Sequence, residues 1–146
     1  MKKRILAIDY GSKRTGIAVT DTEQIIASGL TTIETPQVLT FLANYFAKEE
    51  VECVVVGNPK NLDNTPAQSA AGVQEFIKRL KNKHPDMPLY MVDERFTSKM
   101  AFQAMIDGGL KKKDRRNKAT IDMVSAAIIL QSFMEIKKGG NLPAPV

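Results

Sequence analysis

The stretch KRILAIDYGSKRTGIAVTD, residues 3–21, holds two short apolar runs separated by a turn that opens at Gly11. The run over 3–10 is apolar until Asp9, which is typical of a buried strand. A second strand is predicted over 15–21, and a turn this short joins strands that run antiparallel. The stretch therefore predicts a β-hairpin with an acid near the end of its first strand.

The remaining strands follow from the same kind of pattern. A third strand over 25–33 comes after another short turn, so the first three strands predict an antiparallel meander. The run CVVVG, 53–57, shows no polar alternation and predicts a strand covered on both faces. A fifth strand is predicted over 88–94.

Four helices are expected between and after these strands. The first begins at Pro36 with Thr35 as its N-cap, because proline is favoured at the first helical position. The second carries the apolar stripe Val73, Phe76, Ile77 and Leu80 and ends before Pro85. A short helix capped by Ser98 stops at Gly108 and Gly109, and the last helix runs over 120–137.

This order predicts an α/β fold with a five-stranded mixed sheet: a three-strand antiparallel meander, two parallel strands, and helices on both faces. Two helical crossovers add strands four and five parallel to strand one, and their right-handedness allows few layouts, so the carboxyl ends of these three strands share one edge. Ligands of open α/β sheets favour that edge. At 146 residues the chain predicts one domain over 1–138, with a flexible tail over 139–146.

The charge of the chain is concentrated in one segment. The stretch KKKDRRNK, 111–118, carries six basic residues and one acid, and outside it 15 basic and 15 acidic residues balance. A neutral body with one cationic segment predicts a docking surface for polyanions such as nucleic acid, although a solvated loop that aids solubility has the same pattern. A single cysteine, Cys53, and the absence of any 18-residue apolar run favour a reduced, cytoplasmic setting without a membrane span.

Acidic residues gather at the predicted carboxyl edge. Asp9 ends the first strand, Asp93 and Glu94 end the fifth, and Asp122 begins the last helix. Clustered carboxylates repel one another unless a cation binds between them, and Mg²⁺ takes such hard oxygen ligands together with substrate phosphates. Strand alternation allows only one of Asp93 and Glu94 to face the helix layer of Asp122, and the longer Glu94 is favoured, with Asp93 in reserve. An acid that caps a turn or complements a helix dipole is the simpler alternative for Asp9 and Asp122.

Basic residues flank the acids. Lys13 and Arg14 lie in the turn GSKRTG, and Arg95 follows Glu94, so each can contact phosphates. The predicted nucleic-acid contacts also include the basic segment, that is Lys111, Lys112, Lys113, Arg115, Arg116 and Lys118.

Four stretches resemble a known family. DYGSKRTGIAVTD (9–21), VVVGNP (54–59), DERFTS (93–98) and DMVSAAIILQ (122–131) look like the YqgF/RuvX family of bacterial proteins, in the right order over nearly the whole chain. The resemblance implies a ribonuclease H-like fold and a metal-dependent nuclease that matures the 5′ end of pre-16S ribosomal RNA. It places the family's catalytic and metal-binding acids on Asp9, Glu94 and Asp122, with one or two Mg²⁺ or Mn²⁺ ions as cofactor.

Several alternatives stay open at this point. The same chemistry serves a Holliday junction resolvase acting on branched DNA, and a non-catalytic RNA-binding assembly factor would use the basic segment alone. Many ribonuclease H-like relatives carry an acid at the end of strand four, where this chain has Gly57 or Asn58, so the number of metals is open. The oligomeric state is open as well. An actin-like ATPase needs a second such domain, for which 146 residues leave no room.

Overall fold

A five-stranded mixed sheet forms the centre of the protein in this computed structural model, which describes residues 3–58, 70–93 and 118–146. The strands are β1 Arg4–Asp9, β2 Arg14–Thr20, β3 Ala27–Glu34, β4 Val51–Asn58 and β5 Leu89–Asp93. Their order in the sheet is β3-β2-β1-β4-β5. β1 pairs antiparallel with β2 and parallel with β4, while β3 and β5 extend the sheet antiparallel and parallel, respectively. The predicted meander followed by two parallel strands is therefore confirmed.

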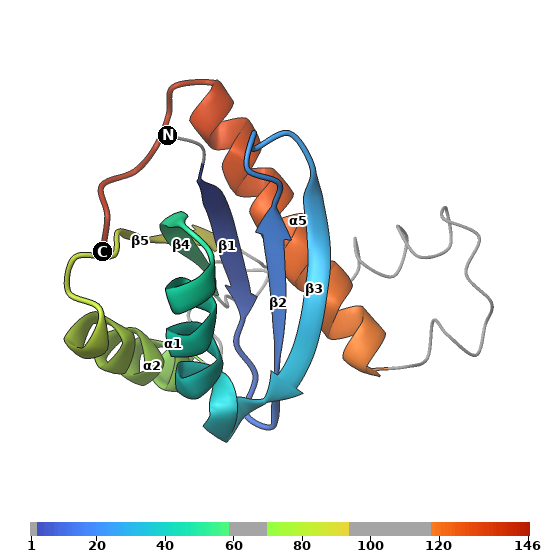
Figure 1. Ribbon diagram of the computed structural model, residues 1–146, viewed down its shortest axis with the longest axis vertical. Helices are drawn as coiled ribbons and strands as arrows, with labels where there is room; N and C mark the ends of the chain where they lie inside the picture. Colours follow the sequence, from blue (N-terminus) through green and yellow to red (C-terminus); the bar gives the residue numbers. More distant parts are fainter. Residues whose placement is uncertain (1–2, 59–69, 94–117) are drawn as a thin grey trace.

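Helices cover both faces of the sheet (Figure 1). The short 3-10 turn η1 (Thr35–Gln37), α1 (Val38–Lys48) and α2 (Ala70–Lys83) lie on one side, and α5 (Lys118–Lys138) crosses the other. Two apolar clusters result. Leu6 and Ile8 of β1 pack with α1 and α2, whereas Ile5 and Ala7 pack with α5.

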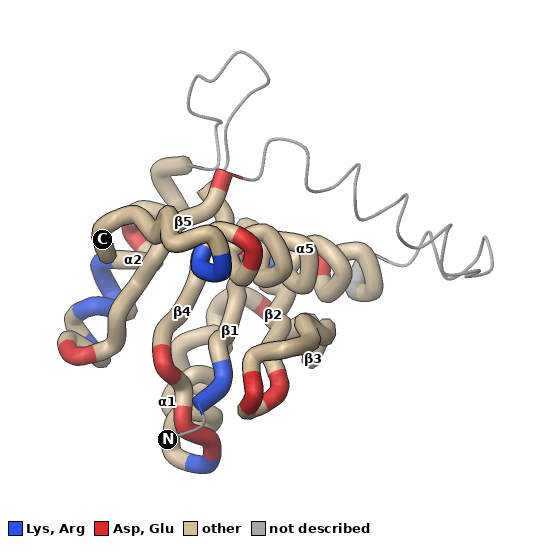
Figure 2. Tube along the Cα trace, turned by 90° about the horizontal axis from the view of Figure 1, so that it is seen from above, with Lys and Arg blue, Asp and Glu red and all other residues tan. Residues whose placement is uncertain are grey.

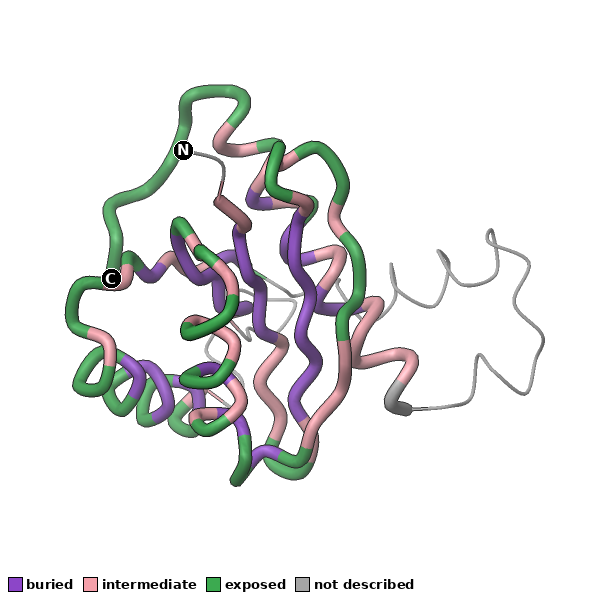
Figure 3. The backbone as a smooth tube through the Cα atoms, viewed as in Figure 1, coloured by how far each residue is buried: buried purple, intermediate pink, exposed green. Residues whose placement is uncertain are grey.

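β1 lies in the middle of the sheet, and its four residues from Ile5 to Ile8 are fully buried. Figure 3 shows this buried centre, with exposure increasing toward β3 and toward the chain ends. Because successive side chains of a strand point to opposite faces, the continuous apolar run of β1 fits a strand covered on both sides. The same alternation determines which face of the sheet carries Asp9, the acidic residue that ends β1.

Two local predictions were wrong. Ile25 and Ile26 belong to the turn before β3, where they are 71% and 62% exposed, because both backbone N–H groups donate to the carboxylate of Asp21 at 2.8 Å. Thr35 lies inside η1, and the cap position, Glu34, makes no side-chain capping bond. The Thr35 hydroxyl instead bonds Thr15 and Gly11, so a long-range contact replaces the predicted helix cap.

The other predicted helices and strands either agree with those of the structure or lie outside the described residues. The last helix is three residues longer than predicted, and the predicted short helix after Ser98 lies outside the described ranges. In the C-terminal segment the backbone N–H of Val146 donates to the carbonyl oxygen of Leu89 at 2.8 Å. Among the helices that the structure describes, none combines the length and apolar character that crossing a membrane requires.

Candidate active site

Asp9 ends β1 on the face that α5 covers. Ala7 and Ile5, two and four positions earlier in the strand, belong to the apolar cluster shared with α5. Alternation along the strand therefore directs Asp9 to the same side, away from the cluster that contains Leu6 and Ile8. Asp9 itself is only partly buried. The central strand thus delivers a carboxylate to the α5 side at its carboxyl end.

Asp122, in the second turn of α5, lies next to the same point, and Gly16 of β2 is the link. Gly16 is the antiparallel partner of Asp9, and a Cβ added at Gly16 would stand 2.1 Å from the carbonyl oxygen of Asp122. Only a residue without a side chain allows the helix backbone to approach the strand this closely. Asp9 and Asp122, which are far apart in the sequence, are therefore neighbours across Gly16.

A basic side chain accompanies the two acids. The Nε of Arg14 donates to Oδ2 of Asp122 at 3.2 Å, and the two side chains are 40% and 24% exposed. Arg14 begins β2 two residues before Gly16, so both lie on the α5 face of the strand. The contact was not expected from the sequence, which predicted Arg14 only as a phosphate ligand.

The turn that carries Lys13 and Arg14 is fixed to the body of the protein. A Cβ at Gly11 would lie 2.3 Å from the carbonyl oxygen of Arg14, so this turn requires glycine. Thr35 closes it from outside: its N–H donates to the carbonyl oxygen of Lys13 at 3.0 Å and its hydroxyl donates to that of Gly11 at 2.6 Å. Sequence reasoning missed this function of Thr35, because its position before a proline suggested a helix cap.

The side chains at the end of β5 alternate between the two faces of the sheet. Leu89 and Met91 face α1 and α2, whereas Tyr90 and Val92 face α5. Asp93 follows Val92 and therefore lies on the face opposite Asp9 and Asp122, where it is exposed. In β4, Gly57 continues the α5-facing row of Cys53 and Val55, so this position next to β1 supplies no side chain.

The side chains of the other predicted site residues are not among those that the structure describes. Lys118 is the first residue of α5, but its side chain is not described. The predicted residues beyond the described ranges are Glu94, Arg95, Lys111, Lys112, Lys113, Arg115 and Arg116. Figure 2 shows acidic and basic positions mixed along the rest of the chain.

The donor set fits a hard divalent cation. Within residues 3–58, 70–93 and 118–146, no group of three or more acidic, histidine or cysteine residues could hold a metal ion. Two neighbouring carboxylates are nevertheless what Mg²⁺ commonly takes from a protein, since water and substrate phosphates complete its shell. Asp9 and Asp122 would hold such an ion, which supplies charge stabilisation to a phosphoryl displacement when it is bound.

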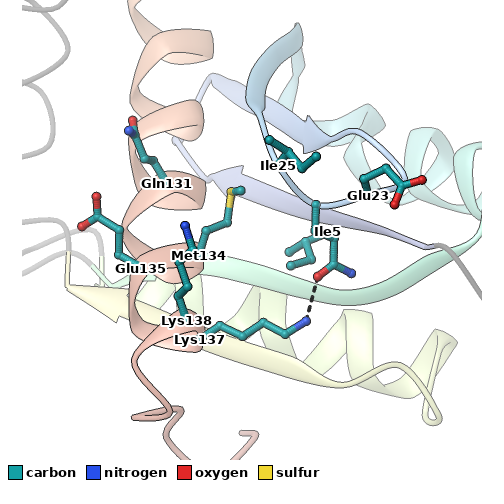
Figure 4. Close-up of a pocket in the computed structure, with 9 residues that line it drawn as sticks. Ile5, Glu23, Ile25, Gln131, Met134, Glu135, Lys137 and Lys138 are labelled. Carbon is teal, nitrogen blue, oxygen red and sulfur yellow. Dashed lines mark hydrogen bonds between the residues drawn. The ribbon is translucent and has the colours of Figure 1, made fainter.

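The other chemically distinctive groups lie away from the acids. A hollow of about 540 Å³ lies at the opposite end of α5, lined by residues such as Gln131, Glu135 and Lys137 (Figure 4). There Nζ of Lys137 donates to the side chains of Gln24 and Glu52, which ties the helix to the sheet. Cys53 is buried, and burial raises the pKa of its thiol to about 12, so it is protonated and unreactive at neutral pH.

A five-stranded mixed sheet of order β3-β2-β1-β4-β5 with helices on both faces is the architecture of the ribonuclease H-like class. The fold is that of Thermus thermophilus RuvC. The RuvC chain in a structure described as a complex with a Holliday junction substrate superposes on this chain with a TM-score of 0.60 at 18% identity, and the match covers 99% of each chain. The chain belongs to the RuvX family, described as "Holliday junction resolvase", whose profile matches residues 3–136.

Two relatives show how much of the chain this family relationship spans. A protein of Christiangramia forsetii is 61% identical over 131 residues, which cover 90% of this chain and 97% of the relative. A protein of Phocaeicola vulgatus is 58% identical over 135 residues, covering 92% and 97%. Both carry the name "Putative pre-16S rRNA nuclease".

Proposed function

We propose that this protein is a metal-dependent nuclease that hydrolyses phosphodiester bonds in the cytoplasm and processes the 5′ end of pre-16S rRNA. The observation that carries the proposal is the meeting of Asp9 and Asp122 across Gly16, at the edge of the sheet where α/β proteins bind ligands. The names of the two relatives support ribosomal RNA as the substrate.

Glu94 is the third proposed carboxylate. Asp93 lies on the face of α1 and α2, opposite Asp9 and Asp122, which leaves Glu94 as the candidate acid of this stretch of sequence. Together Asp9, Glu94 and Asp122 would bind one or two Mg²⁺ or Mn²⁺ ions. In a two-ion site the metals stabilise the attacking and the leaving oxygen of an in-line displacement.

A cleavage assay tests the function directly. Purified protein is incubated with precursor 16S rRNA and with a four-way DNA junction, each with and without Mg²⁺. Metal-dependent cleavage of the RNA supports the proposal, whereas cleavage of the junction alone supports a resolvase. Asp9→Asn should abolish cleavage and keep nucleic-acid binding, because it removes a metal ligand and no phosphate contact. A variant that cleaves at the parent rate contradicts the assignment of Asp9.

The basic segment over 111–118 is proposed to dock the nucleic acid beside the acids, since it leads directly into α5. Each cation that neutralises a phosphate should add about −0.7 to −0.9 to the slope of log affinity against log salt concentration. Affinity is measured by fluorescence anisotropy from low to high salt. A flatter slope with unchanged folding is expected for a variant that combines Lys112→Ala, Lys113→Ala, Arg115→Ala and Arg116→Ala. An unchanged slope would mean that this segment is only a solvated surface.

A further inference from the structure

The ion pair between Arg14 and Asp122 joins two well-supported positions. Arg14 begins β2, and the turn before it is held by Thr35 through bonds of 3.0 Å and 2.6 Å. Asp122 belongs to α5, whose backbone lies against Gly16. The 3.2 Å contact from Nε to Oδ2 therefore puts a positive charge beside a carboxylate that lies next to Asp9.

We propose that Arg14 is a positioning residue that serves as the counter-ion of Asp122 in the metal-free protein and turns to a substrate phosphate when a metal ion binds. This inference rests on the proposed nuclease function. It makes Arg14 a competitor of the metal ion for Asp122, and it makes metal binding and nucleic-acid binding mutually reinforcing.

The exposure of the pair suits an exchange of partners. The side chains are 40% and 24% exposed, and ion pairs this open to water are weak. The bond to Asp122 uses one of the five N–H donors of the guanidinium, whose planar fork matches phosphate as well as carboxylate. Arg14 can therefore leave Asp122 at little cost once a phosphate is close.

Two effects of Arg14 on metal affinity oppose each other. The ion pair orients Asp122, which favours the metal, and the guanidinium charge repels a divalent cation. Asp122 is already placed by a helix, so the loss of orientation concerns only its side-chain rotamers. A divalent ion that binds Asp122 must either tolerate the repulsion of the guanidinium or displace it from an exposed ion pair, which costs up to about 1 kcal/mol and so weakens metal binding up to about fivefold. The repulsion dominates.

The first test measures Mn²⁺ affinity of the full chain without nucleic acid, by calorimetric titration. Arg14→Gln keeps a hydrogen-bond donor and removes the charge, so it should bind Mn²⁺ about three- to fivefold more tightly than the parent. Arg14→Lys keeps the charge and should stay within about twofold of the parent. Arg4→Gln is the matched control, because Arg4 pairs with Glu49 at 3.3 Å at the start of β1, and it should leave the affinity unchanged.

The second test measures the affinity for a short single-stranded RNA in EDTA and in Ca²⁺. If Arg14 turns to phosphate only when a metal ion holds Asp122, Arg14→Gln should lose at least about threefold more RNA affinity in Ca²⁺ than in EDTA, as binding linkage requires. Equal losses in both buffers would overturn the exchange of partners.

The outcomes separate this inference from the proposed function. Asp9→Asn and Asp122→Asn should each weaken Mn²⁺ binding strongly; if neither does, the metal site and the role of Arg14 both fail. If they do, but Arg14→Gln binds Mn²⁺ as the parent does or more weakly, only the role of Arg14 fails. If Arg14 only holds Asp122 in place, Arg14→Gln should bind Mn²⁺ more weakly than the parent. The direction of the change in Mn²⁺ affinity therefore distinguishes a competing counter-ion from a purely structural residue.

Discussion

Replacing Gly16 with alanine should force α5 away from the sheet. The added Cβ would stand 2.1 Å from the carbonyl oxygen of Asp122, 2.5 Å from its carbonyl carbon and 3.1 Å from its Cβ. Real Cβ contacts essentially never fall under 3.0 Å, so the helix backbone must move by about 0.9 Å at this point. The contacting atoms are backbone atoms, so no side-chain rotation relieves the clash.

The size of the effect follows from the packing of the helix. Ala126, Ile129, Leu130 and Phe133 anchor α5 in the core, so the shift strains a packed interface. Overpacking of this kind costs about 2–3 kcal/mol, which lowers Tm by about 6–10 °C in a domain of this size. A displacement near 1 Å between catalytic groups also costs about a hundredfold in rate, so cleavage should fall by that order.

Thermal unfolding followed by circular dichroism measures the first effect, and a single-turnover cleavage assay measures the second. Gly29→Ala is the matched control. Its Cβ would meet Met123 Cβ at 3.1 Å and the Met123 carbonyl oxygen at 3.3 Å, so a shift of a few tenths of an ångström suffices. We expect its stability to change by less than about 1 kcal/mol. If Gly16→Ala melts and cleaves like the parent, Gly16 does not set the position of the helix.

Three further measurements test other features. Gly72→Ala in α2 should raise the free energy of unfolding by about 0.5–1 kcal/mol in urea titrations, because the nearest atom to the new Cβ, in Tyr10, is 3.7 Å away and alanine favours a helix. Cys53 should react with a thiol reagent only after the protein unfolds. Burial raises the pKa of its thiol to about 12, so the contribution of the buried thiol to the free energy of unfolding is complete at neutral pH and is lost between about pH 9 and pH 12. Lys137→Met should cost at most about 1 kcal/mol near pH 7, and the cost should shrink as the pH falls and Glu52 is protonated. The hydrogen bond from Lys137 lowers the pKa of the half-exposed Glu52, so the stability from this pair is present above the ordinary pKa of Glu52 and is lost as the pH falls through the lowered one.

Strand order was predictable because it depends on patterns that extend over several residues. The apolar runs at 3–10 and 53–57 and the short turns between the first three strands suffice to predict a meander followed by parallel strands. Local boundaries depended on single contacts that the pattern does not contain. Ile25 and Ile26 look like strand residues, but the carboxylate of Asp21 holds their N–H groups in a turn.

The sequence named candidate acids for the site, but it did not indicate the contacts that hold them. Asp9 is conspicuous in the sequence because it interrupts an apolar strand, and alternation along the fifth strand separates Asp93 from Glu94. The contact between Arg14 and Asp122 spans 108 positions of sequence, and no local pattern reports it. Gly16 carried a signal, since glycine inside a strand often marks a close backbone approach, but its position near a turn suggested turn geometry instead.

The distance in sequence between Asp9 and Asp122 bears on synthesis at the ribosome, where the chain emerges from its N-terminus. Until residues 118–138 have emerged, β1 and β4 lack the helix that buries Ile5, Ala7 and Val55. A nascent chain therefore presents a bare apolar sheet face and only one of the two neighbouring acids, and a product truncated before α5 lacks both a closed core and the site. The helix that closes this face of the core and carries Asp122 is therefore made after the sheet that it covers.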